Sequence, residues 1–174
     1  LLVYVSYYFR RSKINNILID FECDDFVIVN KPHGVLSHPT NTSKELTVSD
    51  FLKDKYNLSG VGDIGREGVV HRLDRVTTGL MVCPINDESF KVFKSMFHDR
   101  NIKKYYKALV EGNLQSKTGE IELPLKRSGK NRKKREVSKD GKNAITKYST
   151  ILQEESFSLL DIKLITGRNH QIRA

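Results

Sequence analysis

The chain has 174 residues, 38% of them hydrophobic and none of them Trp, which suits one ordinary globular core and leaves little room for a second full domain. Lys and Arg number 30 against 21 Asp and Glu, so the net charge is +9 and the pI is near 9.5. This balance favours a polyanionic partner, nucleic acid above all, although a solvated basic surface would give the same numbers.

The cysteines and the first residues give no sign of metal binding, secretion or membrane insertion. Cys23 and Cys83 lie far apart without a CxxC pair, so neither a zinc site nor a disulfide framework is indicated. The apolar opening, residues 1–9, is short and is followed rather than preceded by Arg10 and Arg11, which is the wrong polarity for a signal peptide. We expect a cytoplasmic protein with no metal site and no membrane segment.

The first half of the chain predicts a strand, a helix and a loop. Residues 24–32, DDFVIVNKP, form a β-branched run closed by a proline, which predicts a buried strand that enters a loop. Thr47 stands three residues before Asp50, close to a capping box, and predicts the start of a helix. Residues 57–68 are rich in glycine and predict a loop.

A second strand and helix follow this loop. GLMVC, residues 79–83, predicts the strand, and Asn86 is placed to cap a helix in which Phe90, Phe93 and Phe97 recur at helical spacing. We assign these three rings to the core and not to a surface that stacks on bases.

Strands dominate the second half of the chain. Three of them are predicted at residues 105–112, 121–125 and 144–151. In residues 158–166, apolar and charged side chains alternate, as in a half-buried strand. Several strands with helices inserted between them predict an α+β fold around a mostly antiparallel sheet.

The most polar stretch of the chain, residues 126–142, lies between two of these strands. It holds nine Lys or Arg and two acids, so +7 of the net charge of +9 lies there. It could be a solvated loop, or a hairpin arm whose cations contact phosphates and release counterions.

One short motif points to chemistry. GVVHRLDRVTTGLMV, residues 68–82, places Asp74 before a Thr-Thr-Gly turn that enters a strand, and a carboxylate on a loop at a sheet edge is well placed for a site. Taken alone, Asp74 could equally cap a helix or pair on the surface with Arg72 or Arg75.

HRLD followed by the TTG turn resembles the defining motif of RluA-type RNA pseudouridine synthases, in which Ser usually stands where Thr78 stands here. Four further segments resemble that family in the expected order: DDFVIVNKPHGVLSHP (24–39), KKYYKALVEG (103–112), GKNAITKY (141–148) and LITGRNHQIR (164–173). The resemblance implies the pseudouridine synthase catalytic fold, a mostly antiparallel mixed sheet with inserted helices and an RNA-binding cleft.

The resemblance also implies a reaction without a cofactor, in which the uridine N-glycosidic bond breaks, the base rotates and C5 is joined to the ribose. Asp74 aligns with the family's nucleophile, which attacks either the ribose C1′ or the base C6. Tyr106, and not Tyr105, aligns with the tyrosine that stacks on the base and helps to remove the C5 proton. Arg173 aligns with the arginine that keeps the aspartate ionised, which requires the two groups to lie within hydrogen-bonding distance.

Several residues are expected to contact RNA or to support the motif loops. Arg72 aligns with the residue that fills the gap left by the flipped uridine. The other expected RNA contacts are Arg168, Lys133, Lys134 and Arg135. We expect the polar motif residues His71, His170 and Gln171 to hydrogen-bond the loops without transferring protons or binding metal.

These motifs predict two segments. Residues 1–19 are an N-terminal extension or the remnant of a linker, and residues 20–174 are a catalytic domain truncated at its C-terminus, because the family's domain continues past the arginine motif. We expect a monomer that acts on ribosomal RNA or tRNA. The alternatives are a noncatalytic basic RNA-binding module and a hydrolase that uses Asp74 with a second carboxylate, for which no partner acid stands out in the sequence.

Overall fold

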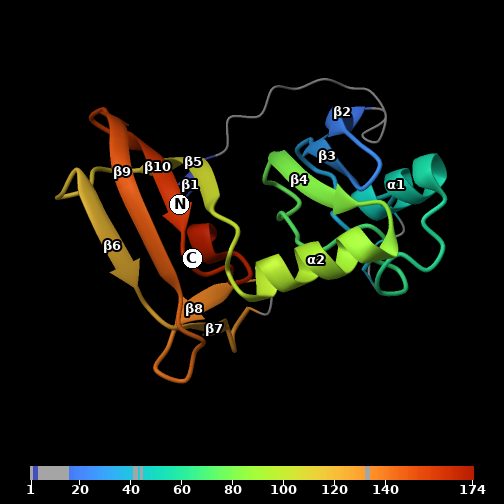
Figure 1. Ribbon diagram of the computed structural model, residues 1–174. Helices are drawn as coiled ribbons and strands as arrows, with labels where there is room; N and C mark the ends of the chain where they lie inside the picture. The colour runs from blue at the N-terminus through green and yellow to red at the C-terminus, as the bar shows by residue number, and fades with distance from the viewer. Residues whose placement is uncertain (1, 4–15, 41–42, 44, 132–133) are drawn as a thin grey trace. The chain divides into compact units, whose positions relative to one another are not determined.

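The computed structural model describes residues 2–3, 16–40, 43, 45–131 and 134–174. The chain forms two compact units: the first comprises residues 6–101, and the second comprises residues 102–174 together with residues 1–5. Each unit has its own antiparallel sheet (Figure 1), and every pairing between the described strands is antiparallel. The α+β class is confirmed.

The first unit contains a three-stranded sheet and two helices. The strands lie in the order β2–β3–β4, and the elements are β2 (Leu18–Glu22), β3 (Phe26–Lys31), α1 (Val48–Tyr56), β4 (Gly79–Pro84) and α2 (Asp87–His98). The predicted strands and both helix starts are confirmed. Strand β2 was not predicted, because its side chains are mostly exposed and its sequence therefore shows no alternation. None of the described helices is long and apolar enough to cross a membrane.

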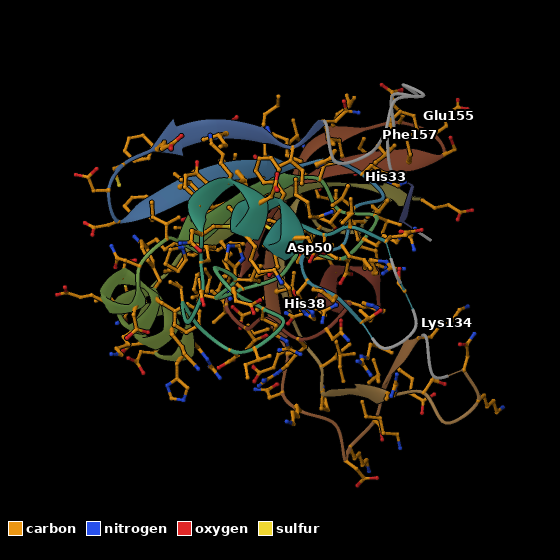
Figure 2. The ribbon with its side chains drawn as sticks, turned by 90° about the vertical axis from the view of Figure 1, so that its right-hand side faces the viewer. His33, His38, Asp50, Lys134, Glu155 and Phe157 are labelled. Carbon is orange, nitrogen blue, oxygen red and sulfur yellow. The ribbon has the colours of Figure 1, made fainter. Side chains whose placement is uncertain are left out.

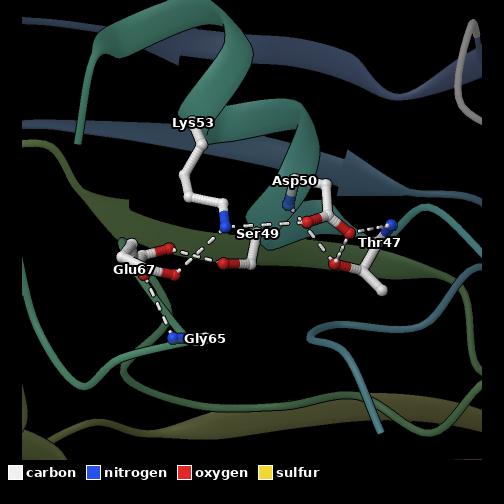
Figure 3. A network of polar contacts seen from close by, with 6 residues as sticks. All are labelled: Thr47, Ser49, Asp50, Lys53, Gly65 and Glu67. Atoms are coloured by element: carbon white, nitrogen blue, oxygen red, sulfur yellow. Dashed lines mark hydrogen bonds and ion pairs between the residues drawn. The ribbon is translucent and has the colours of Figure 1, made fainter. Parts of the chain in front are cut away.

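The predicted capping box begins α1 (Figure 3). The Thr47 hydroxyl oxygen accepts from the Asp50 backbone N–H at 3.3 Å, and the Thr47 N–H donates to the Asp50 carboxylate at 2.9 Å. Two of the N–H groups that a helix start leaves without intrahelical partners are thus satisfied.

Glu67 ties the glycine-rich loop to this helix. Its carboxylate accepts from the Gly65 N–H at 3.0 Å and lies 3.5 Å from Lys53 Nζ, while its carbonyl accepts from the Ser49 hydroxyl at 3.0 Å (Figure 3). The chain is therefore anchored a few residues before it reaches Asp74.

Lys31 lies at the end of β3 and is fully buried. Alternation along the strand places it on the same side as Val27 and Val29. Its Nζ donates to the carbonyl oxygens of Pro32 at 3.0 Å, Val35 at 2.8 Å and Arg75 at 3.4 Å. Three backbone carbonyls from two loops thus share one ammonium group, whose three donors they satisfy. Burial lowers the pKa of Lys31 from 10.5 to about 8, while the charge of Asp74 raises it.

This pKa predicts how stability changes with pH. Between pH 8 and 10.5 the unfolded chain holds a proton on Lys31 that the folded chain has lost, so the contribution of Lys31 to the free energy of unfolding rises as pH rises. We expect the difference in unfolding free energy between the wild type and Lys31→Met to be larger at pH 10 than at pH 7, by about 2 kcal/mol. Urea denaturation of both proteins at each pH measures it.

Lys117→Met is the control, because that side chain is exposed. Its difference in unfolding free energy from the wild type should change less between the two pH values than that of Lys31→Met. A Lys31→Met difference that does not change with pH would mean that the folded state holds the proton as firmly as the unfolded state.

The second unit is built on a five-stranded sheet. Its order is β1–β5–β10–β9–β6, and the strands are β1 (Leu2–Val3), β5 (Lys104–Glu111), β6 (Thr118–Glu122), β9 (Ile145–Gln153) and β10 (Phe157–Leu164). The alternation predicted for residues 158–166 is confirmed, because Leu160, Ile162 and Leu164 are buried with Ala108 in one cluster.

The basic stretch forms a hairpin. Strand β7 (Leu125–Arg127) pairs with β8 (Arg135–Val137), with Leu125 opposite Val137 and Arg127 opposite Arg135. The strand predicted at 121–125 is interrupted instead, because β6 ends at Glu122 and β7 begins at Leu125, on either side of a proline that has no N–H to donate. The hairpin geometry of the arm is confirmed.

Candidate active site

Asp74 lies on a loop that interlocks with the loop after β3. The hydroxyl of Ser37, which is 3% exposed, donates to the Leu73 carbonyl at 3.0 Å and accepts from the Leu73 N–H at 3.1 Å. The Gly34 N–H donates to the Arg75 carbonyl at 2.7 Å. Asp74 therefore stands between two residues whose backbones are bonded to a neighbouring loop.

A turn completes this support. The Thr77 N–H donates to the Asp74 carbonyl at 3.0 Å, and His33 Nδ1 lies 3.0 Å from the Val76 carbonyl oxygen. The Asp74 side chain is half-buried. A carboxylate on a backbone held from both sides is what a preorganised nucleophile needs.

The structure excludes one of the ordinary roles of Asp74. Thr47 and Asn86 cap α1 and α2, so a helix-capping role in the described elements is wrong. The two nearby arginines also contact other side chains: Arg75 Nη2 lies 2.7 Å from Glu45 Oε1, and Arg72 Nη1 lies 3.2 Å from His38 Nε2.

His71 has the structural role that was expected. Its Nε2 accepts from the Val82 N–H at 3.1 Å, and its ring stacks on Phe97 at a centroid distance of 4.4 Å. Among the residues that the structure describes, no group of three or more His, Cys, Asp or Glu side chains is arranged to hold a metal ion.

Tyr106 lies on β5 in the second unit. It is half-buried against the apolar cluster of that unit, and Ile172, the residue before Arg173, packs on the same cluster. Tyr105 is 65% exposed, because neighbouring residues on a strand point to opposite faces. The second unit therefore brings Tyr106 and the arginine motif to one face of its sheet.

Gln171 holds the arginine motif in place. It is 8% exposed and begins the 3₁₀ helix Gln171–Arg173. Its Oε1 accepts from the Thr166 hydroxyl and the Arg168 N–H, both at 2.8 Å, and its Nε2 donates to the Ile145 carbonyl at 3.0 Å and the Thr146 hydroxyl at 2.9 Å. The loop-supporting role expected of Gln171 is confirmed.

The remaining basic residues lie around this motif. Arg168 Nε donates to the Asn143 carbonyl at 2.8 Å, and Arg135 Nε donates to the Asn169 carbonyl at 3.3 Å, a link between the arm and the motif that the sequence analysis did not foresee. Arg173 is exposed. Lys134 is exposed beside β8 (Figure 2), whereas Lys133 lies outside the described residues.

Ser37, His38 and Lys31 support the site without having been predicted from the sequence. Lys31 carried a usable signal, because Val27, Val29 and Lys31 follow one another at intervals of two, which places Lys31 on the buried face of the strand. Asp74 belongs to the first unit, whereas Tyr106 and Arg173 belong to the second. The approach of Asp74 to Arg173 stays a prediction.

We predict that Gln171→Leu destabilises the second unit by about 1 to 3 kcal/mol, because it leaves buried donors and acceptors without partners. Denaturant unfolding of the variant measures this cost. Asn169→Leu, at an exposed side chain in the same loop, is the control and should change stability by less than about 0.5 kcal/mol. Equal losses in both variants would remove Gln171 from this role.

Comparison with known proteins agrees with these motifs. Residues 25–174 match the RNA pseudouridylate synthase family. The ribosomal large subunit pseudouridine synthase D of Borreliella burgdorferi is 39% identical over 165 residues, which cover 90% of this chain and 49% of that protein. The protein of the same name from Zymomonas mobilis is 37% identical over 159 residues, covering 89% of this chain and 50% of that protein. The chain thus spans about half the length of these relatives.

Solved structures share the fold. Human RNA Pseudouridylate Synthase Domain Containing 4 aligns with a TM-score of 0.70 at 24% identity and covers 89% of this chain and 61% of that one. Human RNA Pseudouridylate Synthase Domain Containing 1 gives a TM-score of 0.73 at 22% identity, over 95% of this chain and 66% of that one. The fold class predicted from the motifs is confirmed, and the chain belongs to the RNA pseudouridylate synthase family.

Proposed function

We propose that the protein containing this chain converts uridines in RNA to pseudouridine, with Asp74 as the nucleophile. The observation that carries the proposal is the fixed loop around Asp74, in which Ser37 and Gly34 bond the residues on either side of it. Family membership over residues 25–174 supports the same chemistry.

The reaction needs no external reactant. The bond between N1 and C1′ breaks, C5 forms a bond to C1′, and the proton lost from C5 is balanced by one gained at N1. A carboxylate suits this sequence because it forms a covalent adduct that can be cleaved again, either at C1′ or at C6 of the base. Tyr106 would stack on the base and help to remove the C5 proton.

Two arginines complete the proposed site. The Arg173 guanidinium would pair with Asp74 and keep it ionised and correctly aimed, with N···O distances of roughly 2.7 to 3.2 Å in the closed site. Arg72 would occupy the space that the flipped uridine leaves in the RNA stack, because unstacking a base costs a few kcal/mol.

The charge of the chain supports RNA as the partner. The arm of residues 126–142 carries nine cations against two acids, and Arg135 links it to the arginine motif through Asn169. Two of the relatives are named ribosomal large subunit pseudouridine synthase D, which favours ribosomal RNA, with tRNA as the alternative. We further propose an RNA-binding cleft, in which Arg168 also contacts the substrate, and a cytoplasmic monomer.

Asp74→Asn should abolish isomerisation, because it removes the nucleophilic carboxylate, and should leave RNA affinity within about threefold, because it removes little volume and no phosphate contact. Pseudouridine is measured in RNA after incubation with the full-length protein, as a uridine isomer of unchanged mass.

Asp54→Asn is the matched control, because that carboxylate is exposed near the end of α1, and it should retain full turnover. Retained turnover in Asp74→Asn would contradict the assignment. Binding without any isomer in the wild type would favour the noncatalytic RNA-binding module, and released uracil would favour a hydrolase.

Neutralising the arm should weaken RNA binding in a salt-dependent way. The triple variant with Lys133→Gln, Lys134→Gln and Arg135→Gln loses up to about three phosphate contacts. The slope of the logarithm of the RNA association constant against the logarithm of the salt concentration should therefore become less negative by up to about 2 to 3. Binding titrations at salt concentrations from about 50 to 300 mM, where the release of counterions dominates the salt dependence, provide the slope.

The control for the arm carries the same change in charge on α2 and just after its end: Lys91→Gln, Lys94→Gln and Arg100→Gln combined. It should leave the slope nearly unchanged. An arm variant whose slope matches that of the wild type would mean that these cations are only solvated.

A further inference from the structure

His38 is a buried histidine beside the proposed site, and neither the motifs nor the reaction gave it a role. It lies in the loop after β3 and is 6% exposed (Figure 2). Its Nδ1 lies 2.8 Å from the Pro39 carbonyl oxygen, and its Nε2 lies 3.2 Å from Nη1 of Arg72.

These two contacts determine the protonation of the ring. A guanidinium can only donate hydrogen bonds, so Nε2 must accept and carry no hydrogen. A carbonyl oxygen can only accept, so Nδ1 must carry the hydrogen. His38 is therefore the neutral tautomer with hydrogen on Nδ1. Protonation of Nε2 would place its N–H opposite the N–H of Arg72 Nη1, and two donors cannot bond each other.

The surroundings favour the same neutral form. Burial lowers the pKa of His38, the hydrogen bond to the Pro39 carbonyl raises it, and the positive charges of Arg72 and Arg66 lower it. The net effect is a pKa below 6.5, so the imidazole is neutral at pH 7 and able to accept from Arg72.

Arg72 needs such a partner. Its side chain is exposed, and a free arginine side chain loses rotamer entropy when it is ordered on a substrate. The backbone after it is already fixed, because Leu73 is bonded through both its N–H and its carbonyl to Ser37. The bond to His38 orders the guanidinium as well.

We propose that His38 is a positioning residue that holds the Arg72 guanidinium, through its unprotonated Nε2, in the orientation in which Arg72 enters the RNA stack. This inference rests on the proposed function. Protonation of His38 releases Arg72, so activity falls on the acidic side of neutrality through weaker productive binding of RNA, seen in kcat/KM more than in the chemical step.

The tautomer is tested without any activity measurement. Nitrogen-15 NMR of the full-length protein at pH 7.5 should show His38 with a protonated Nδ1 and an unprotonated Nε2, its signals being identified by their loss in His38→Gln. In Arg72→Met the ring should sample both tautomers and its pKa should rise. A ring protonated on Nε2, or one unaffected by Arg72→Met, would overturn the proposal.

Kinetics then test positioning. The Oε1 of Gln can replace Nε2 as an acceptor but does not titrate, so His38→Gln should keep kcat/KM within about threefold at pH 7.5 and lose the acidic decline. His38→Leu should lower kcat/KM about tenfold, and combining it with Arg72→Met should be no worse than Arg72→Met alone, because the two residues act as one unit. His98→Gln, on the exposed end of α2, should behave as the wild type.

The outcomes separate the two proposals. A fully active His38→Leu, or losses from His38→Leu and Arg72→Met that simply add, would overturn positioning while leaving the isomerase intact. Turnover retained in Asp74→Asn would overturn the proposed nucleophile and leave the tautomer result standing. If His38→Leu fails to fold, His38→Gln and the NMR measurement decide.

Discussion

The ammonium group of Lys31 is the interaction on which the first unit depends. It lies at the end of β3 without solvent contact and binds carbonyl oxygens from the loop that follows, together with the Arg75 carbonyl from the loop that carries Asp74. A buried charge is costly, and the three carbonyl bonds offset part of that cost, so the ammonium group favours the arrangement of the two loops that surrounds it. Through the Arg75 carbonyl, the backbone next to Asp74 is thereby fixed in space relative to β3.

Uncharged polar side chains hold loops in both units in the same way, by bonding several groups at once. Ser37 is bonded to both polar groups of Leu73, and Gln171 uses all four of its hydrogen-bonding positions to hold the arginine motif. Fully satisfied polar networks specify one arrangement more sharply than apolar packing does. Asp74 and the arginine motif thus stand on segments that buried, hydrogen-bonded polar groups hold in place.

The positive charge of the chain is distributed differently from these buried polar groups. The cations gather on the arm that contains the β7–β8 hairpin, and a hydrogen bond from Arg135 to the Asn169 carbonyl links this arm to the arginine motif. In the proposed function, the cations of the arm bind RNA and Asp74 carries the chemistry, so the two tasks use separate parts of the chain.

The sequence by itself determined most of the strands, both helix starts and the motifs, because alternation, capping and turn residues are local signals, and it left the basic stretch open between a solvated loop and a hairpin. It also identified Gln171 as a support. It did not predict the division into two units, nor that Lys31, Ser37 and His38 hold the loops around Asp74. Those roles join residues 34 to 44 positions apart, and only the tertiary structure brings such partners together, since a hydrogen bond across two loops leaves no periodic trace in the sequence.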